Sequence, residues 1–239
     1  MSFLTALKLA TSRSSMSKLV ERSILNIPTR CFSSKMTIVD VGAHSGQFID
    51  AVCLISPKAS IIAIEPNETL CNELEHTYGD RITIVRGVAS NKNDYGEIVV
   101  TDDFASWSML KPKEIMNESY GHGFTHITTN KVKSFTLDSI CADIPVIDIL
   151  KIDVQGYERQ VLEGATDVLN RTKCIIVEVT YYNHYDGDIS FWELHNVLKA
   201  NRFVLYDLTK PFRLNDVSLW SDAIYVKRDD CDELLNASL

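Results

Sequence analysis

The stretch 38-IVDVGAHSGQFIDA-51 combines an aspartate with two closely spaced glycines, at a point where an apolar run gives way to a helical pattern. A strand that ends in such a loop and opens a helix places backbone N–H groups above the carboxyl edge of a parallel sheet, where ligands bind. The order DxGxxxG, formed by Asp40, Gly42 and Gly46, differs from the phosphate-binding pattern GxxxxGK and from the dinucleotide fingerprint GxGxxG. The pattern therefore indicates a nucleoside-type ligand, with a tight turn that binds nothing as the alternative.

A second acid, Glu65, ends the next apolar run, 19 residues beyond Gly46. An acid in this position hydrogen-bonds ribose hydroxyls in dinucleotide-binding folds, and both NAD and S-adenosylmethionine contain a ribose. Asp40 distinguishes the two, because a carboxylate beside the loop repels a pyrophosphate and attracts an ammonium and a sulfonium group. We therefore predict S-adenosylmethionine as the cofactor. An NAD(P)-dependent Rossmann oxidoreductase and a non-catalytic methyltransferase-like binding protein are the alternatives.

A second dense motif, 150-LKIDVQGYERQVLEGA-165, ends another apolar run and opens a helix. Lys151 and Asp153 are two residues apart on a strand, so their side chains share one face of the sheet. We expect Asp153 at the carboxyl edge, beside the reactive methyl group if the first strand is its neighbour. Glu158 lies near the helix N-terminus, where it can serve as a cap or as a charge partner.

The combination of VDVGAHSGQF, AIEPN and LKIDVQGYERQVLEGA resembles the FkbM family of S-adenosylmethionine-dependent methyltransferases, over about residues 37–180. The third stretch is the most specific part of the likeness. The resemblance implies the class I methyltransferase fold, a Rossmann-like α/β architecture with a seven-stranded, mostly parallel sheet, a reversed C-terminal hairpin and helices on both faces. It also implies O-methylation of a hydroxyl group on a sugar, a polyketide-type product or a related small molecule.

The resemblance further implies a cofactor site built from the glycine loop and from neighbouring strand ends. In this site the loop binds S-adenosylmethionine, Glu65 takes the ribose, and Val88 and Ala89 border the adenine. The loop of the family usually reads Gly-Ala-Asn, and this chain has His44 at the third position. The cofactor-binding residues predicted in this way are Asp40, Gly42, Ala43, His44, Gly46, Phe48, Glu65, Pro66, Val88, Ala89 and Asp153.

Methyl transfer to a hydroxyl group requires a base, because an alcohol is a poor nucleophile until its proton leaves. The candidates are Asp153 and three histidines, His122, His126 and His184, and we predict Asp153 and His184 as the catalytic residues. We predict no metal ion; the alternative is a divalent cation held by Asp153 with Glu178 or Asn183. The aromatic stretch YYNHYDG (181–187) is expected to form the acceptor pocket for a small molecule or a glycan.

Short β-branched runs alternate with helical patterns from residue 36 onward, which is typical of a parallel sheet wrapped by helices. Between residues 87 and 135 the alternation gives way to two antiparallel strands separated by a long loop. The expected strands are 37–41, 60–64, 81–85, 146–153 and 173–179, followed by RFVLYDL and DAIYVK. The expected helices are 47–56, 67–77, YERQVLEGATDVL as one helix, and SFWELHNVLKAN. Asn67 is expected to be the N-cap of the second of them.

The chain has 239 residues, is 45% hydrophobic and carries a net charge of −8. This size suits one large α/β domain, and the acidic balance argues against a nucleic-acid partner. The six cysteines show no paired or metal-binding spacing, which favours a reducing compartment. No apolar run reaches the ~18–20 residues of a membrane span. We therefore expect a cytoplasmic protein.

The first 35 residues are rich in serine and basic residues and nearly free of acids. Their leucines and isoleucines recur at roughly helical spacing, which indicates an amphipathic helix that packs on the domain. The composition also fits a targeting peptide for a mitochondrion or plastid. We therefore divide the chain into an N-terminal basic segment, residues 1–35, and a methyltransferase domain, residues 36–239.

Overall fold

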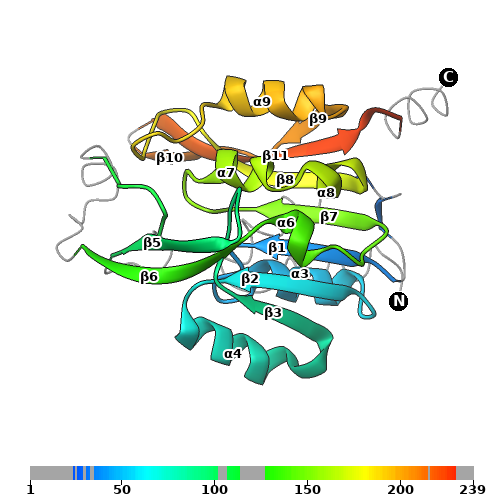
Figure 1. Ribbon diagram of the computed structural model, residues 1–239. Coiled ribbons are helices and arrows are strands. Elements are labelled where there is room, and N and C mark those ends of the chain that lie inside the picture. Colours follow the sequence, from blue (N-terminus) through cyan, green and yellow to red (C-terminus); the bar gives the residue numbers. More distant parts are fainter. Residues whose placement is uncertain are drawn as a thin grey trace, which may run out of the picture.

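The computed structural model describes residues 24, 26–28, 31–32, 35–101, 107–113, 127–214 and 216–229. One large sheet runs through the middle of the molecule, with helices on both of its faces (Figure 1). A smaller sheet extends from one side of it. The class I arrangement predicted from the sequence is confirmed.

Five parallel strands form the centre of the large sheet. In spatial order they are β3 (Ile82–Arg86), β2 (Ser60–Glu65), β1 (Thr37–Val41), β7 (Ile147–Ile152) and β8 (Thr172–Thr180). The first strand along the chain, β1, therefore has β2 on one side and β7 on the other. This reversal of strand order at β1 is a topological switch point, where ligands bind outside the carboxyl ends of the strands.

The sheet closes with antiparallel strands. The long strand β11 (Val217–Lys227) runs antiparallel to β8, and its other edge carries β9 (Phe203–Leu208) followed by β10 (Phe212–Leu214). The large sheet thus has eight strands, which corrects the predicted seven. Pro211 lies between β9 and β10, and because proline has no N–H to donate to the ladder, two short strands replace one long one.

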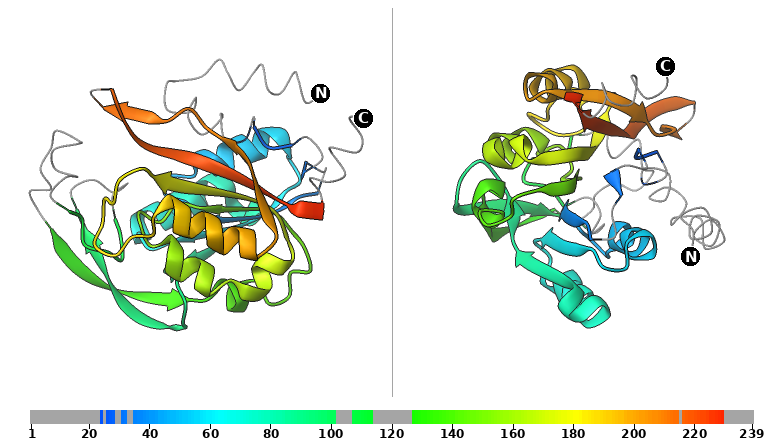
Figure 2. Two further views of the ribbon diagram at one scale, coloured as in Figure 1. Left: turned by 90° about the horizontal axis from the view of Figure 1, so that it is seen from above. Right: turned by 90° about the vertical axis from the view of Figure 1, so that its right-hand side faces the viewer.

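Helices cover the two faces of the sheet unequally (Figure 2). One face carries α3 (Gln47–Ile55) and α4 (Glu68–Tyr78), which a 3-10 turn (Gly79–Arg81) follows. The opposite face carries α6 (Leu137–Ile140), α7 (Glu158–Glu163), α8 (Thr166–Asn170) and α9 (Phe191–Ala200). As predicted, α4 is capped by Asn67, whose Oδ1 accepts hydrogen bonds from the N–H groups of Thr69 and Leu70.

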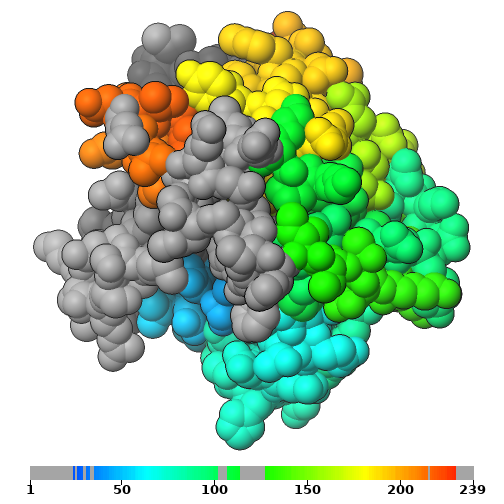
Figure 3. Space-filling view, turned by 90° about the vertical axis from the view of Figure 1, so that its left-hand side faces the viewer, coloured from blue at the N-terminus to red at the C-terminus, as the bar shows by residue number. Residues whose placement is uncertain are grey.

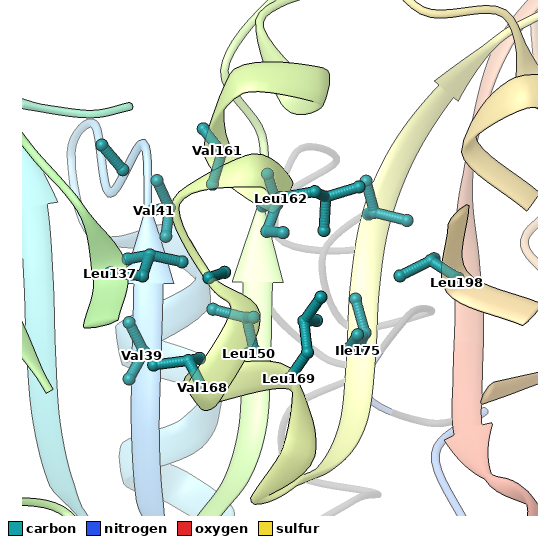
Figure 4. Packing of buried hydrophobic residues seen from close by; sticks show 14 of the residues in the cluster. Val39, Val41, Leu137, Leu150, Val161, Leu162, Val168, Leu169, Ile175 and Leu198 are labelled. Atoms are coloured by element: carbon teal, nitrogen blue, oxygen red, sulfur yellow. The ribbon is translucent and has the colours of Figure 1, made fainter. Parts of the chain in front are cut away.

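Alternating side chains along the strands fill both apolar layers. Figure 4 shows the layer under α6 to α9, where strand residues meet the buried faces of the helices. The residues labelled there are Val39, Val41, Leu137, Leu150, Val161, Leu162, Val168, Leu169, Ile175 and Leu198. Their neighbours along the strands, such as Ile38 and Ile149, point to the other face and pack beneath α3.

The helix predicted after β7 is divided into α7 and α8, which corrects the prediction of one continuous helix. The division occurs at Gly164. A Cβ atom on this residue would lie 2.0 Å from the backbone oxygen of Ser90, so the chain passes here in close contact with the neighbouring segment. A tertiary contact, which helical periodicity does not encode, therefore ends α7 early.

The smaller sheet contains β5 (Asp94–Val100) paired antiparallel with β6 (Thr128–Phe135), as the alternating pattern predicted. A two-residue strand, β4 (Val88–Ala89), lies parallel to β6 on its other edge. The N–H of Gly87 donates to the backbone oxygen of Glu65 over 3.1 Å. The smaller sheet is thereby attached to the end of β2.

Part of the N-terminal segment packs on the domain. Ile24, Ile27 and Cys31 are buried in the apolar layer that α3 covers. Most of the helix predicted for this segment lies outside the described residues. In the part of the chain that the structure describes, no helix is long and apolar enough to cross a membrane.

Candidate functional site

The two sequence motifs meet where the parallel strands end. The N–H of Asp153 donates to the backbone oxygen of Val41 over 3.0 Å, so the loop after β7 lies against the end of β1. Gly42 adopts a left-handed φ of +80°, and a Cβ atom there would lie 1.9 Å from the backbone oxygen of Asp153. Gly42 is thus required because two loops touch, which is a packing reason independent of any ligand.

Glycine is required at position 46 for a similar packing reason. Its φ is +81°, and a Cβ atom would lie 2.7 Å from both a Leu74 methyl group and the hydroxyl of Tyr78. The same hydroxyl donates a hydrogen bond to the backbone oxygen of Gly46 over 3.0 Å. Both glycines of the loop therefore serve close packing of the chain, and a ligand would be held by the polar groups around them.

Glu65 holds the loop from the end of β2. Its Oε2 accepts a hydrogen bond from the N–H of His44 over 2.8 Å, and its Oε1 accepts one from the N–H of Asn67 over 2.9 Å. Burial raises the pKa of Glu65, and the two N–H donors oppose this rise. Each carboxylate oxygen keeps a second lone pair, so Glu65 retains the capacity to accept hydrogen bonds from ribose hydroxyls, as predicted for it.

The backbone of His44, rather than its side chain, connects this residue to Glu65. Its φ of +47° is in the left-handed region, which is uncommon for a residue with a side chain. The conformation directs its N–H to Glu65 and leaves the ring Nδ1 3.1 Å from the Ser45 hydroxyl. Ala43 is buried behind it, and its N–H, like that of Gly42, donates to the backbone oxygen of Ile64.

Asp40 is completely buried, and its nearest charged partner is Lys151 on β7. The two residues are direct neighbours across β1 and β7, and Oδ1 of Asp40 lies 3.6 Å from the ammonium nitrogen. This separation makes an ion pair but is too long for a hydrogen bond. Burial raises the pKa of Asp40, and Lys151 opposes that rise. The charge argument made from Asp40 alone is therefore corrected: a cation stands beside the acid.

Phe48 lies under the same ammonium group, with its ring centroid 5.9 Å from Nζ of Lys151. The ring is buried in the layer beneath α3. The ring therefore contacts the lysine, and the cofactor-binding role of Phe48 stays a prediction.

Asp153 is fixed by two donors. Lys151 Nζ lies 3.3 Å from its Oδ2, and Gln155 Nε2 donates to its Oδ1 over 3.0 Å. Gln155 is in turn held by Tyr185, whose hydroxyl donates to Oε1 over 3.0 Å, and by Ser108, whose hydroxyl donates to the backbone oxygen over 2.7 Å. About a third of the Asp153 side chain, 32%, remains exposed. Asp153 is therefore both oriented and reachable.

His184 lies in the loop after β8, next to Tyr185, and its side chain is almost fully buried. Burial lowers the pKa of His184, so the ring is neutral at physiological pH. The N–H groups of His184 and Tyr185 both donate to Oδ2 of Asp188, which fixes the loop. Within the described residues, His184 Nε2 has no hydrogen-bond partner. The other two candidate bases, His122 and His126, fall outside the described residues.

The predicted acceptor loop is partly on the surface. Tyr181 and Tyr182 are 40% and 49% exposed, whereas Tyr185 is buried against the loop of Gly156. The strands end on the left-hand side of Figure 1, which faces the viewer in Figure 3. On that face the blue residues near the start of the domain and the orange residues of β10 and β11 both reach the surface.

Two acids of the last strands also join the site. Glu178 on β8 and Asp222 on β11 are direct neighbours across the antiparallel pair. Burial and the nearby Asp153 raise the pKa of Asp222 to about 6, and burial raises that of Glu178 well above its usual value. Sequence reasoning missed Asp222. The signal for it was an acid that interrupts the apolar alternation of WSDAIYVK.

Glu158 braces its own loop. Its carboxylate accepts hydrogen bonds from the N–H groups of Val154 and Gly156 over 3.4 and 3.2 Å, and burial raises its pKa to about 7. Both donors precede α7, whose N-cap residue Tyr157 makes no capping hydrogen bond through its side chain, so Glu158 stabilises the loop before the helix. In the described part of the chain, no group of three or more His, Cys, Asp or Glu side chains is arranged to hold a metal ion.

The remaining predicted residues lie next to the end of β2. Val88 and Ala89 are buried on β4, which Gly87 attaches to Glu65. Pro66 follows Glu65 directly and is partly buried. The structure thus brings the predicted loop residues, the acid of β2, the short strand β4 and Asp153 to one edge of the sheet.

Comparison with known proteins agrees with this arrangement. Residues 40–205 match the family described as the methyltransferase FkbM domain. The 2-O-methyltransferase NoeI of Sinorhizobium fredii is 24% identical over 178 residues, which cover 70% of this chain and 72% of NoeI. The hexuronic acid methyltransferase AglP of Haloferax volcanii is 26% identical over 151 residues, which cover 59% of this chain and 54% of AglP, about half of its length.

A solved structure supports the fold. The crystal structure of an S-adenosylmethionine-dependent methyltransferase from Clostridium acetobutylicum superposes with a TM-score of 0.51 at 9% sequence identity, and the match covers 92% of this chain and 95% of that one. This likeness concerns the architecture alone. The family match extends from the acid of the glycine loop to the strand after α9 and thus includes both motifs. The chain therefore belongs to the FkbM methyltransferase family.

Proposed function

We propose that this FkbM methyltransferase transfers the methyl group of S-adenosylmethionine to a hydroxyl group of a carbohydrate. The observation that carries the proposal is the junction of the two motifs, at which the loop of Gly42 touches the backbone of Asp153. The junction lies at the switch point of the sheet, where a ligand between the strand ends would reach Asp153 and Glu65 together. The two relatives support the acceptor class, since one is named as a 2-O-methyltransferase and the other as a hexuronic acid methyltransferase.

The polar groups of the site fit this cofactor. Both side-chain oxygens of Asp40 are buried without a hydrogen-bond partner among the described residues, and Glu65 has lone pairs to spare. Glu65 would hold the ribose, the loop of residues 40–46 would hold the methionine portion, and Val88 with Ala89 would border the adenine. The bound cofactor supplies an activated methyl group on a sulfonium.

The residues of this chain then have two tasks, to orient the acceptor hydroxyl and to take its proton. Asp153 is our candidate for both, because Lys151 and Gln155 fix its carboxylate and a third of it stays exposed. His184 is the second candidate base, since its neutral ring has an unpartnered Nε2 within the described residues. The exposed rings of Tyr181 and Tyr182 would offer flat apolar faces to a sugar.

A cytoplasmic location remains part of the proposal. Cys53, Cys71 and Cys141 are free thiols. This agrees with a reducing compartment. The net charge of −8 argues against a nucleic acid as the acceptor.

The acceptor class is tested with isotope-labelled S-adenosylmethionine and two simple probes, a neutral methyl hexoside and a methyl hexuronoside. We expect label in at least one of them, and treatment with base should leave the label in place, because an ether resists hydrolysis and an ester does not. Label that enters a non-carbohydrate fraction of a cell extract, with both sugars unlabelled, would contradict the carbohydrate assignment.

The cofactor assignment is tested through Glu65. We expect S-adenosylhomocysteine to raise the melting temperature of the wild-type chain and NAD to leave it unchanged. Substitution Glu65→Ala should weaken S-adenosylhomocysteine binding by about tenfold to a hundredfold in calorimetry, since hydrogen bonds to a charged group are lost. The matched control is Glu68→Ala, which removes an exposed acid that pairs with Arg86 on the surface. Equal affinities for the two variants would remove Glu65 from the cofactor site.

A further inference from the structure

Lys151 stands among carboxylates that come from several elements of the large sheet. Its side chain is only 12% exposed. The acids that face it are Asp40 on β1, Glu65 on β2, Asp153 after β7, Glu178 on β8 and Asp222 on β11, and Glu158 on α7 lies near Asp153 and Glu178. The ring of Phe48 on α3 closes the remaining side.

Two of these acids contact the ammonium group directly. Nζ of Lys151 lies 3.6 Å from Oδ1 of Asp40 and 3.3 Å from Oδ2 of Asp153. Asp40 is the acid of the first motif, at the end of β1 before the glycine loop, and Asp153 belongs to the second motif. One ammonium group thus connects the two stretches that sequence analysis identified separately.

The ion pair is the main polar interaction that the structure gives Asp40. Its two side-chain oxygens are fully buried and have no hydrogen-bond partner among the described residues. A buried carboxylate of this kind is strongly destabilising unless a cation accompanies it. The geometry of the glycine loop therefore depends on the charge at residue 151.

We propose that Lys151 is a positioning residue for methyl transfer: its ammonium group bridges Asp40 and Asp153 and fixes both loops in the arrangement that binds S-adenosylmethionine. The inference rests on the proposed function, because it assigns a role in the site that this cofactor would occupy. The proposal predicts that loss of the positive charge at residue 151 lowers the affinity for the cofactor, even though Lys151 lies beneath the loop.

The electrostatics of the cluster agree with this role. Burial disfavours the charged form of Lys151, but Asp153, Asp40 and Asp222 outweigh it and raise its pKa, so the ammonium is charged at neutral pH. In the other direction, Lys151 counteracts the rise that burial imposes on the pKa values of Asp40, Glu178 and Asp222. Removing the lysine leaves these carboxyls without that compensation.

The test is a double-mutant cycle with four chains: wild type, Asp40→Asn, Lys151→Met and the double variant. Melting temperature and calorimetric affinity for S-adenosylhomocysteine are measured for each, and Lys151→Arg is added because it keeps the charge. We expect Lys151→Met to lose about tenfold in affinity and to melt below the wild type, while Lys151→Arg recovers part of both. The double variant should melt above Lys151→Met, since the buried carboxylate of Asp40 is then no longer left without its cation.

The pH dependence separates this role from simple packing. A carboxyl group whose pKa is raised in the folded chain costs stability as the pH rises above its ordinary value, because the unfolded chain releases the proton first. Without Lys151 the pKa values of Asp40, Glu178 and Asp222 rise further. The melting temperature of Lys151→Met should therefore fall further below the wild type at about pH 8 than at about pH 5.

Each outcome decides the inference. If Lys151→Met binds S-adenosylhomocysteine as tightly as the wild type, or if its stability deficit is the same at both pH values, Lys151 is not a positioning residue. If Lys151→Met does not fold and the double variant does not fold either, the ion pair with Asp40 is not the cause, and the inference is overturned. Absence of binding by the wild type would contradict the proposed function as well, whereas wild-type binding with unaffected variants contradicts only the inference.

Discussion

Replacing Gly42 with alanine is expected to lower the free energy of unfolding by about 3 to 5 kcal/mol and to abolish cofactor binding. The added Cβ atom would lie 1.9 Å from the backbone oxygen of Asp153, a distance that no side-chain rotation relieves. The loop after β7 would have to move away from β1, and the hydrogen bond from the Asp153 N–H to Val41 would break. Chemical denaturation and S-adenosylhomocysteine calorimetry measure the two effects.

Gly187 provides the matched control. Its φ of +83° is almost equal to the +80° of Gly42, but a Cβ atom there would meet nothing within 4 Å. Substitution Gly187→Ala should therefore cost only the backbone preference, about 1 kcal/mol. Similar losses of unfolding free energy in the two variants would show that the close approach of Gly42 to Asp153 does not contribute to stability.

Substitution Asp153→Asn is expected to lower turnover by about a hundredfold or more while cofactor affinity changes much less. Asparagine has nearly the same shape, and the backbone contact with Val41 is retained, so the glycine loop keeps its support. What is lost is the carboxylate, which alone can take a proton and which Lys151 and Gln155 hold in place. Steady-state rates with a labelled sugar acceptor, together with calorimetry, separate the two quantities.

Asp148 serves as the control on the same strand. It lies at the opposite end of β7, where it pairs with Lys173 over 2.7 Å and accepts a hydrogen bond from the N–H of Thr37. Substitution Asp148→Asn should reduce stability and leave turnover per folded molecule unchanged. Full activity of Asp153→Asn would exclude Asp153 as base, and His184 would become the leading candidate.

The elements nearest the cofactor loop were predictable because their signals are local. The strand 37–41, the helix after Gly46 and the cap at Asn67 were all indicated by neighbouring residues, and the structure confirms them. The motifs themselves were also recognisable from residues that are close together in the sequence. The family could therefore be recognised from stretches of about 5 to 16 residues without knowledge of their packing.

The contacts between motifs were not predictable, because they depend on strand order and register. Asp40 meets Lys151 only because β1 and β7 are adjacent with these two residues opposite each other. Asp222 reaches the site because β11 turns back antiparallel to β8. The positive φ of Gln155, which places its amide on Asp153, likewise follows from the surrounding loops. Periodicity predicts which face of the sheet a side chain points to, but it does not predict which residues of the neighbouring strands lie beside it.

The burial of Ile24, Ile27 and Cys31 beneath the domain limits how the N-terminus can be processed. A protease that removes a leader from this chain would have to cut before residue 24 to keep the apolar layer under α3 intact. Cleavage after residue 31 would expose buried side chains of α3 to water and create an adhesive surface on that face. If residues are removed from this end of the chain as a leader, the cut has to lie earlier than the change in composition at residue 35 indicates.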